Sequence, residues 1–137
     1  MTAPRQATLE LSSQDQLAIA RRTVQEWATA LGFGTLDRTK LVTAASEIGR
    51  NTLVHGGGGR MTIEEVTNDN YQQGLRLVFE DQGPGIPDID RALTDGYTTA
   101  KSMGLGFGGA KRLVNEFNVR SAPGQGTTVT LIQWKRR

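Results

Sequence analysis

The pattern of hydrophobic residues changes from alternating to helical within the first 31 residues of the chain. Apolar and polar residues alternate over residues 7–11, which predicts a half-buried strand. Apolar residues then recur at helical spacing over residues 17–31, which predicts an amphipathic helix. Ser13 and Gln16 have the spacing of a capping box at its start, and Gly32 can end it in the left-handed conformation.

A second helix and two strands follow this first helix. Helical spacing continues over residues 36–55, and the glycine run 56–59 ends the pattern. Apolar and polar residues then alternate over residues 61–64 and again over residues 75–80, which predicts two strands. The polar segment 68–74 between them is the expected connection.

The C-terminal part begins with a long stretch that is rich in turn residues. Residues 83–103 contain at most one short helix, near residues 88–94. A glycine-rich turn then begins a helix that is expected to continue to about Asn115. Residues 118–121 and 127–134 are expected to form a hairpin of two strands, and the Pro-Gly pair between them favours a type II turn.

The order of these elements predicts the fold class. Because several strands follow one another without an intervening helix, we expect a mixed, mostly antiparallel sheet with the helices on one face. This is a two-layer α/β sandwich and not a doubly wound parallel sheet. The chain of 137 residues suits one domain, residues 1–137, with one hydrophobic core.

Composition narrows the classes of function. The formal charge is only +2, which is little for a nucleic-acid-binding protein. The sequence has no apolar run long enough for a membrane span and no signal segment at its start. It has no cysteine, and its one histidine, His55, has no metal-ligand partner nearby in the sequence. We therefore expect a cytoplasmic protein without a nucleic-acid or membrane partner.

The first candidate site lies on the second predicted helix. Glu47 and Asn51 are four positions apart, which puts them on one helix face with Cβ atoms about 5–6 Å apart. The amide oxygen of Asn51 is a ligand that Mg²⁺ accepts, and the carboxylate of Glu47 can take a proton from an attacking hydroxyl. The same residues are also typical of an ordinary polar helix face, so the pattern alone leaves both interpretations open.

The second candidate site follows the strand over residues 75–80. Asp81 comes at the strand end, directly before a turn that contains Gly83 and Gly85. An ionised carboxylate only accepts hydrogen bonds, so it suits an exocyclic amine such as that of adenine. The glycines would let the backbone approach a ligand closely. A capped strand followed by a Pro-Gly turn explains the same residues equally well.

The third candidate site is the glycine-rich segment 104–109. Glycines before a helix expose backbone N–H donors, and the helix dipole favours an anion there, so phosphate is the expected ligand. Gly104, Gly106 and Gly109 also match a dinucleotide fingerprint literally. No buried strand precedes them, however, and the acidic residue expected about 20 positions later is missing. We therefore reject a Rossmann-type site, and the sequence contains no P-loop.

In their order and spacing, these motifs resemble the successive boxes of GHKL ATP-binding domains. The resemblance covers about residues 36–131 and rests on Glu47-x-x-x-Asn51, Asp81-x-Gly83-x-Gly85, Gly104-x-Gly106 and Gly126-Thr127. Within this superfamily the chain is most similar to the RsbT type of anti-sigma-factor-like serine/threonine kinases. That similarity rests on the stretches GFGT (32–35), DQGPGIPD (81–88), DGYTT (95–99) and AKRLVNEF (110–117).

The resemblance implies a Bergerat-type fold that binds ATP and Mg²⁺. Asn51 would coordinate Mg²⁺, Asp81 would bind the adenine amino group, and Thr127 would support the adenine end. Glu47 would be the catalytic carboxylate that acts on the substrate hydroxyl. Residues 88–103 would form a lid over the nucleotide. Further nucleotide contacts are expected from five glycines and one lysine: Gly83, Gly85, Gly104, Gly106, Gly108 and Lys101.

The resemblance also implies partners. Kinases of the RsbT type phosphorylate STAS-domain proteins in stress-response modules and then regulate a downstream phosphatase, whereas related proteins bind sigma factors and are often dimeric. We therefore expect a Mg-ATP-dependent protein serine/threonine kinase that takes part in partner switching, with a homodimer left open. The alternative is an anti-sigma factor or ATP-dependent binding switch that sequesters a partner without significant turnover. A plain nucleotide hydrolase ranks third, because the chain lacks a signature for positioning water.

Overall fold

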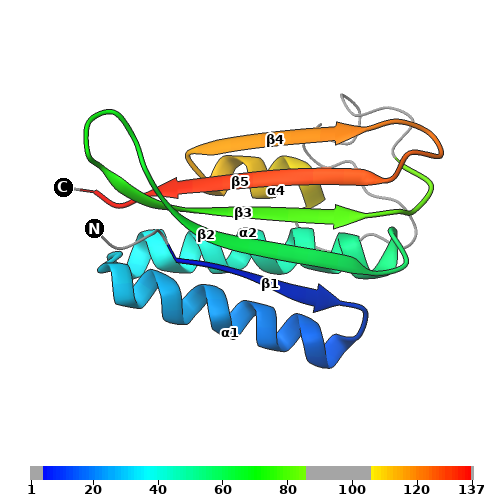
Figure 1. Cartoon of the computed structure of the whole chain (residues 1–137), viewed down its shortest axis with the longest axis horizontal. Helices are drawn as coiled ribbons and strands as arrows, with labels where there is room; N and C mark the ends of the chain where they lie inside the picture. Colours follow the sequence, from blue (N-terminus) through cyan, green and yellow to red (C-terminus); the bar gives the residue numbers. More distant parts are fainter. Residues whose placement is uncertain (1–4, 86–105, 137) are drawn as a thin grey trace.

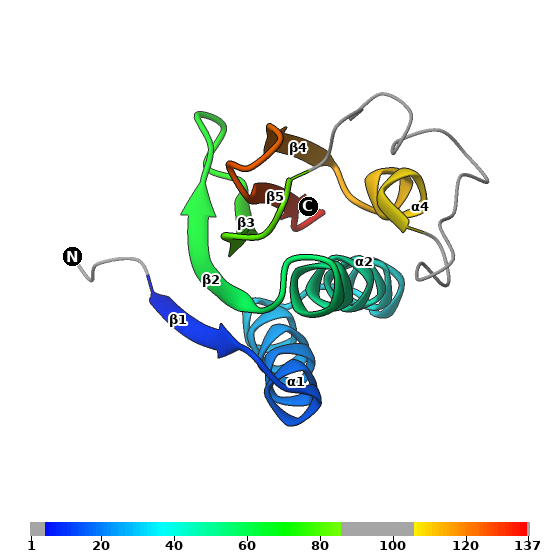
Figure 2. The ribbon, with the colours of Figure 1, turned by 90° about the vertical axis from the view of Figure 1, so that its right-hand side faces the viewer.

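The computed structural model describes residues 5–85 and 106–136. In this part of the chain, five strands form a single sheet of order β1-β2-β3-β5-β4, and all neighbouring strands are antiparallel. Three helices lie on one face of the sheet, as Figures 1 and 2 show. The elements are β1 (Gln6–Leu11), α1 (Gln14–Leu31), α2 (Thr35–Val54), β2 (Gly59–Thr67), β3 (Gln73–Asp81), α4 (Gly106–Leu113), β4 (Glu116–Ser121) and β5 (Thr127–Trp134).

The predicted two-layer sandwich is confirmed. The predicted sheet was mixed and mostly antiparallel, and the described sheet is antiparallel throughout. Each strand begins and ends within three residues of its predicted position, because the alternating pattern marks the residues that face the helices. Among the helices of the described residues, none is both long and apolar enough to cross a membrane.

The signals at both ends of α1 are confirmed. The hydroxyl of Ser13 accepts a hydrogen bond from the backbone N–H of Gln16 at 3.1 Å. The side chain of Gln16 accepts one in return, but its donor is the backbone N–H of Ser12 rather than that of the cap residue. Gly32 ends the helix with φ +88°, a left-handed conformation that glycine adopts without steric cost.

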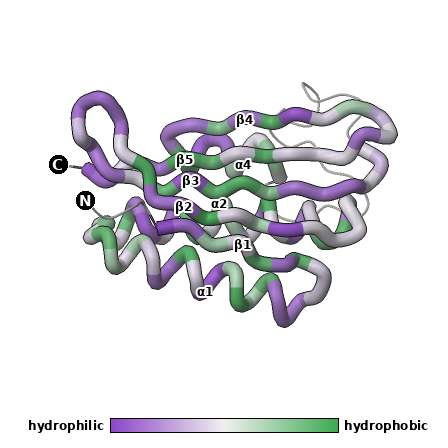
Figure 3. Tube along the Cα trace, in the orientation of Figure 1, coloured by the Kyte–Doolittle hydropathy of each residue, from purple (hydrophilic) through white to green (hydrophobic). Residues whose placement is uncertain are grey.

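The core lies between the sheet and the helices. Its side chains come from alternate positions of β2, β3 and β5 and from one stripe of α1 and α2. Gly49 brings α1 and α2 close together, because a Cβ at this position would lie 2.6 Å from Cδ1 of Leu17. In Figure 3 hydrophobic residues recur along β3, while the loop between β2 and β3 is hydrophilic. This packing fixes α2 against the middle of the sheet.

The hairpin at the end of the chain has the predicted turn. The N–H of Gln125 donates to the carbonyl of Ala122 at 2.9 Å, and Gly124 has φ +75°, as a type II turn requires at its third residue. The helix α4 begins at Gly106 and ends at Leu113, two residues before its predicted end. The short helix predicted near residues 88–94 lies outside the described residues.

Candidate functional site

Asp81 occupies the buried end of the central strand β3. Its side chain is 8% exposed, and its Oδ1 accepts a hydrogen bond from the N–H of Gly83 at 2.9 Å. Across the sheet it is paired with Gly59 of β2 and with Thr127 of β5. An ionised carboxylate offers about four lone-pair positions, so acceptor capacity remains for a ligand that donates hydrogen bonds. The adenine contact predicted for Asp81 requires this acceptor capacity and stays a prediction.

Glycines enclose Asp81 so closely that no side chain would fit in their place. A Cβ at Gly56 would lie 2.5 Å from Oδ2 of Asp81, and a Cβ at Gly83 would lie 2.7 Å from Cα of Gly56. On the other side, Gly126 has φ +75°, and a Cβ there would overlap the carbonyl of Asp81. The end of α2 and the start of β5 therefore both approach the end of β3 through bare backbone.

The residues after Asp81 are held against the hairpin of β4 and β5. The N–H of Gly124 donates to the carbonyl of Pro84 at 2.7 Å. Gly85 has φ +79°, and a Cβ on it would overlap the carbonyl of Ala122. Gly83 and Gly85 thus pack closely on the protein's own backbone, and their predicted contact with a ligand stays a prediction.

Thr127 belongs to a small hydroxyl network beside Asp81. Its side chain is nearly buried, with 9% exposure, and its Oγ1 lies 2.9 Å from Oγ of Ser121. The hydroxyl of Ser121 also donates to the carbonyl of Gly126 at 2.9 Å. Ser121 therefore fixes both the turn that approaches Asp81 and the orientation of the Thr127 hydroxyl.

Glu47 and Asn51 both lie on α2, one turn apart and half-buried. The carbonyl of Asn51 accepts hydrogen bonds from the N–H groups of His55 and Gly56, at 2.9 Å and 3.1 Å. Because Gly56 in turn packs on Asp81, this helix end connects the Asn51 position directly with the end of β3. The helix α4, which begins with Gly106 and contains Gly108, packs against α2.

The structure thus brings part of the predicted site together. Asp81, Gly83, Gly85 and Thr127 converge at one end of the sheet, and the helix of Glu47 and Asn51 ends there. Gly106 and Gly108 lie within the first turn of α4 rather than ahead of it. Lys101, Gly104 and the predicted lid over residues 88–103 lie outside the described residues.

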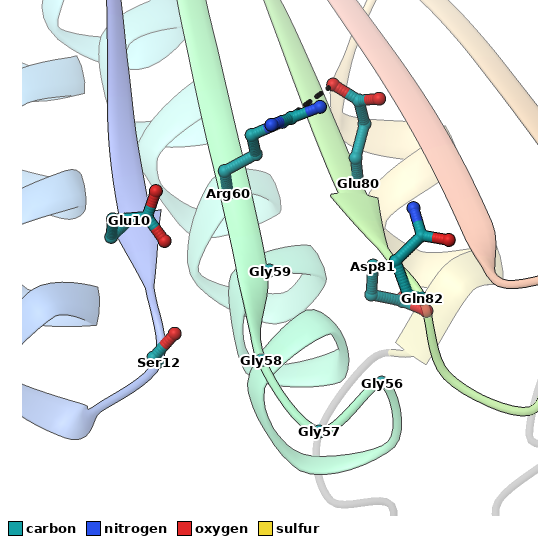
Figure 4. A pocket seen from close by; sticks show the side chains of 10 residues that line it. All are labelled: Glu10, Ser12, Gly56, Gly57, Gly58, Gly59, Arg60, Glu80, Asp81 and Gln82. Atoms are coloured by element: carbon teal, nitrogen blue, oxygen red, sulfur yellow. Dashed lines mark hydrogen bonds and ion pairs between the residues drawn. The ribbon is translucent and has the colours of Figure 1, made fainter.

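A pocket opens beside the end of β3 and shares Asp81 and Gly56 with the site described above. It has a volume of about 500 Å³ and is lined by Glu10, Ser12, residues 56–60 and residues 80–82, as Figure 4 shows. The ion pair of Arg60 with Glu80, at 3.4 Å, lies on its wall. Its lining includes Asp81 but not Glu47, Asn51 or Thr127, so the pocket contains only part of the predicted nucleotide site.

The side chains at this site could bind Mg²⁺ only together with the phosphate groups of a bound nucleotide. Within residues 5–85 and 106–136, no three His, Cys, Asp or Glu side chains gather as a metal centre. The amide oxygen of Asn51 would therefore act together with phosphate oxygens and water, which is how Mg²⁺ is commonly bound at nucleotide sites.

Two residues of the site were missed from the sequence. Gly56 was interpreted only as part of a run that ends a helix, and Ser121 was given no role. The signal for Ser121 is its position in the hairpin, because the register places it opposite Thr127. The contact of Gly56 with Asp81 joins residues 25 positions apart, and no local pattern predicts it.

Comparison with known proteins gives a consistent result. Residues 11–133 match the family model described as the histidine kinase-like ATPase domain. The chain is 40% identical over 131 residues to the serine/threonine-protein kinase RsbT of Bacillus subtilis (strain 168). This alignment covers 96% of this chain and 98% of that protein. It is 30% identical to the anti-sigma F factor of Thermoanaerobacter sp. (strain X514), over 90% of this chain and 89% of that protein.

A solved structure supports the fold. The structure of the RsbU and RsbW domains of Rv1364c from Mycobacterium tuberculosis superimposes with a TM-score of 0.65 and 22% sequence identity. The match covers 99% of this chain and 34% of that longer chain. At this identity, the likeness establishes a shared fold and nothing further.

Proposed function

The chain belongs to the family of histidine kinase-like ATPase domains, with the RsbT type among its relatives, and on that premise we propose that it is a Mg-ATP-dependent protein serine/threonine kinase. The observation that carries this proposal is the buried Asp81 carboxylate at the end of β3, enclosed by glycine backbone and joined through Gly56 to the helix of Asn51 and Glu47. The identity of 40% with a serine/threonine-protein kinase over nearly the whole chain supports the kind of reaction.

The nucleotide would contact the end of β3 and the start of β5 with its base, and α2 and α4 with its phosphates and Mg²⁺. Asp81 would accept a hydrogen bond from the adenine amino group, and the Thr127 hydroxyl, oriented by Ser121, would contact the same end of the base. Asn51 would hold Mg²⁺ through its amide oxygen. The N–H groups in the first turn of α4 would face phosphate, because a helix N-terminus favours an anion.

Transfer would depend on Glu47. Mg-ATP supplies the phosphoryl group that is transferred, and the protein contributes position and charge stabilisation. The Glu47 carboxylate would accept the proton of the serine or threonine hydroxyl on the protein substrate, or orient that hydroxyl for attack. Its half-buried position on α2, one turn before Asn51, suits a group that must meet both a substrate and a nucleotide.

We infer that the substrate is a STAS-domain protein of a bacterial partner-switching module in the cytoplasm. The same chain would then regulate a downstream effector such as a phosphatase. Support for this assignment is the similarity to RsbT together with the quoted motifs of the RsbT type. A homodimer is compatible with this role.

A second function is favoured by a separate observation. The identity of 30% with an anti-sigma F factor over 90% of the chain supports a protein that sequesters a sigma factor or another partner. In this alternative, ATP sets the shape of the binding surface, and turnover is not significant.

A single experiment separates the two functions. The protein is incubated with radiolabelled Mg-ATP and a purified STAS-domain protein or sigma factor from the same organism, and label and complex are measured in the same samples. Label on a serine or threonine of the STAS protein supports the kinase. A stable ATP-dependent complex with the sigma factor, without label on either protein, contradicts the kinase and supports the binding switch.

A further inference from the structure

The end of the molecule opposite Asp81 carries the two most exposed large hydrophobic side chains of the described residues. Tyr71 is 88% exposed and Leu36 is 60% exposed. Figure 1 places the β2–β3 loop, the α1–α2 turn and the C-terminal residues together at this end, with the end of β3 at the other. The nine residues of β3 separate the two ends by about 27 Å.

The loop that carries Tyr71 is organised by the side chain of Asn68. Its Oδ1 accepts hydrogen bonds from the N–H groups of Asn70 and Gln72, both at 2.9 Å. The main chain adds two more bonds, from Asn68 N–H to the carbonyl of Gln72 and from Tyr71 N–H to the carbonyl of Asn68. Four bonds within five residues hold the loop in one shape, so the Tyr71 ring is attached to a fixed base.

The backbone of Tyr71 is strained. Its φ is +60°, and it is the only non-glycine residue in the described chain with a positive φ. This conformation is unfavourable for a bulky side chain, and glycine or asparagine would adopt it more easily. Burial does not explain the choice of tyrosine, because the side chain is in solvent. Strained residues of this kind persist only where the surrounding structure holds them, as the Asn68 loop does here, and they cluster at functional sites.

Hydrogen bonds connect the Tyr71 loop with Leu36. The side chain of Gln72 donates to the carbonyl of Lys135 at 2.8 Å. The next residue, Arg136, forms an ion pair at 2.8 Å with Asp37, which directly follows Leu36 on α2. The two apolar side chains are therefore held in a fixed relation, which lowers the entropy cost of binding both at once.

We propose that this end of the molecule is a docking surface for a protein partner, and we call it the distal surface: Tyr71, Leu36, Lys135 and Arg136. Exposed aromatic residues and arginine are the side chains that most often dominate binding at protein interfaces. Residues 69–72 also line a hollow of about 470 Å³ that can receive a side chain of the partner.

The charges of the distal surface define the partner further. The basic side chains at this end are Arg38, in the first turn of α2, and Lys135 and Arg136 near the C-terminus. The acidic ones are Asp37, which is paired with Arg136, and Asp69 of the Tyr71 loop, so basic groups outnumber acidic ones by three to two. Arg136 remains 71% exposed while it makes this pair. The partner segment therefore carries an apolar or aromatic side chain next to carboxylates. Because this surface is about 27 Å from Asp81, the partner can be held while the nucleotide end stays accessible.

The test selects binders from a phage-displayed library of random peptides of about 12 residues, panned on the intact protein. Enriched peptides are synthesised, and their binding is measured by fluorescence anisotropy and by amide shifts of the ¹⁵N-labelled protein. We expect acidic peptides with a central apolar residue, and shifts confined to residues 68–72, 35–37 and 135–136. We expect Tyr71→Ser and Leu36→Ser each to weaken binding about tenfold or more. Ile19→Ser, a control on α1 at a hydrophobic residue that is 44% exposed, should change binding less than about twofold.

A second variant separates binding from folding. Tyr71→Gly relieves the strained φ and should raise the urea concentration at half-unfolding while it abolishes peptide binding. The proposal is overturned if enriched peptides bind Tyr71→Ser as well as wild type, if they are basic, or if their shifts map to the Asp81 end. It is also overturned if the same residues shift with protein concentration alone, because a second copy would then occupy the surface. None of these outcomes depends on kinase activity.

Discussion

Gly56, just beyond the end of α2, packs directly on the carboxyl group of Asp81 at the end of β3, so closely that a Cβ at position 56 would lie 2.5 Å from Oδ2 of Asp81. Gly56 does not have a positive φ, so an alanine there would be opposed by the contact and not by the backbone conformation. This contact joins the helix that carries Glu47 and Asn51 to the strand that carries Asp81.

Gly56→Ala should therefore weaken nucleotide binding. The added methyl group must move the Asp81 carboxylate or the end of α2, so we expect the affinity for Mg-ATP to fall about tenfold and the free energy of unfolding to fall by about 1–3 kcal/mol. Calorimetric titration and urea unfolding measure the two effects. Gly34→Ala is the control, because a Cβ at Gly34 has no neighbour within 4 Å. Equal nucleotide affinity in the two variants would show that Gly56 does not shape the site.

Asp81→Asn should reduce nucleotide affinity without unfolding the protein. The amide keeps the shape of the carboxyl group but replaces one acceptor oxygen with a donor, which opposes the adenine amino group. We expect a loss of about tenfold or more in ATP affinity, since a hydrogen bond to a charged group contributes about 1.5–3 kcal/mol. Glu80→Gln makes the same chemical change on the opposite face of β3. An Asp81→Asn protein that binds ATP like the Glu80→Gln protein would rule out the adenine assignment.

Ser121→Ala should weaken ATP binding by a smaller factor. The variant loses the bonds to the Gly126 carbonyl and to the Thr127 hydroxyl, so the Thr127 hydroxyl is no longer held in one orientation. One neutral hydrogen bond contributes about 1 kcal/mol, which predicts a loss of about fivefold in affinity. Ser121→Thr restores the hydroxyl on a residue that suits a strand and should recover binding. Weak binding in the threonine variant as well would point to a packing defect.

Ser13→Ala should destabilise the fold and leave the site intact. The variant removes the hydroxyl that accepts the N–H of Gln16 at the start of α1. Loss of such a cap should lower the free energy of unfolding by about 1 kcal/mol, which urea unfolding measures. Ser12→Ala is the matched control, because Ser12 bonds to Gln16 through its backbone N–H, which the substitution keeps. Equal unfolding curves for the two variants would mean that the cap contributes nothing measurable.

The fold was largely predictable from the sequence because its signals are local. Alternation over residues 75–80 marked β3, and Gly32 and Ser13 marked the ends of α1. The antiparallel pairing of β2 with β3 and of β4 with β5 followed from consecutive strands without a crossover helix, whereas the pairings of β1 with β2 and of β3 with β5 span helices and were left open by the prediction of a mixed sheet. The start of β2 at Gly59, inside the glycine run, was missed because glycines are poor strand signals.

The candidate site was predictable only in part. Each motif taken alone could also be an ordinary polar helix face or a turn. The roles of Glu47, Asn51 and Asp81 came from the family resemblance, which rests on the order of the motifs along the chain. The contact of Gly56 with Asp81 and the network of Ser121 depend on how distant segments meet, which periodicity does not encode. The strained φ of Tyr71 also left no trace in the pattern, since nothing about a tyrosine in a polar loop indicates a left-handed backbone.

The most direct test of the account is phosphoryl transfer by wild type and Glu47→Ala, with ATP binding measured on the same preparations. With radiolabelled Mg-ATP and a STAS-domain protein as acceptor, wild type should label a serine or threonine. Glu47→Ala should lower the rate at least about 100-fold, since general acid–base groups contribute about 10²–10⁴ in rate, while ATP affinity stays within about twofold of wild type. Undiminished transfer by Glu47→Ala, or loss of ATP binding in that variant, would contradict the role assigned to Glu47.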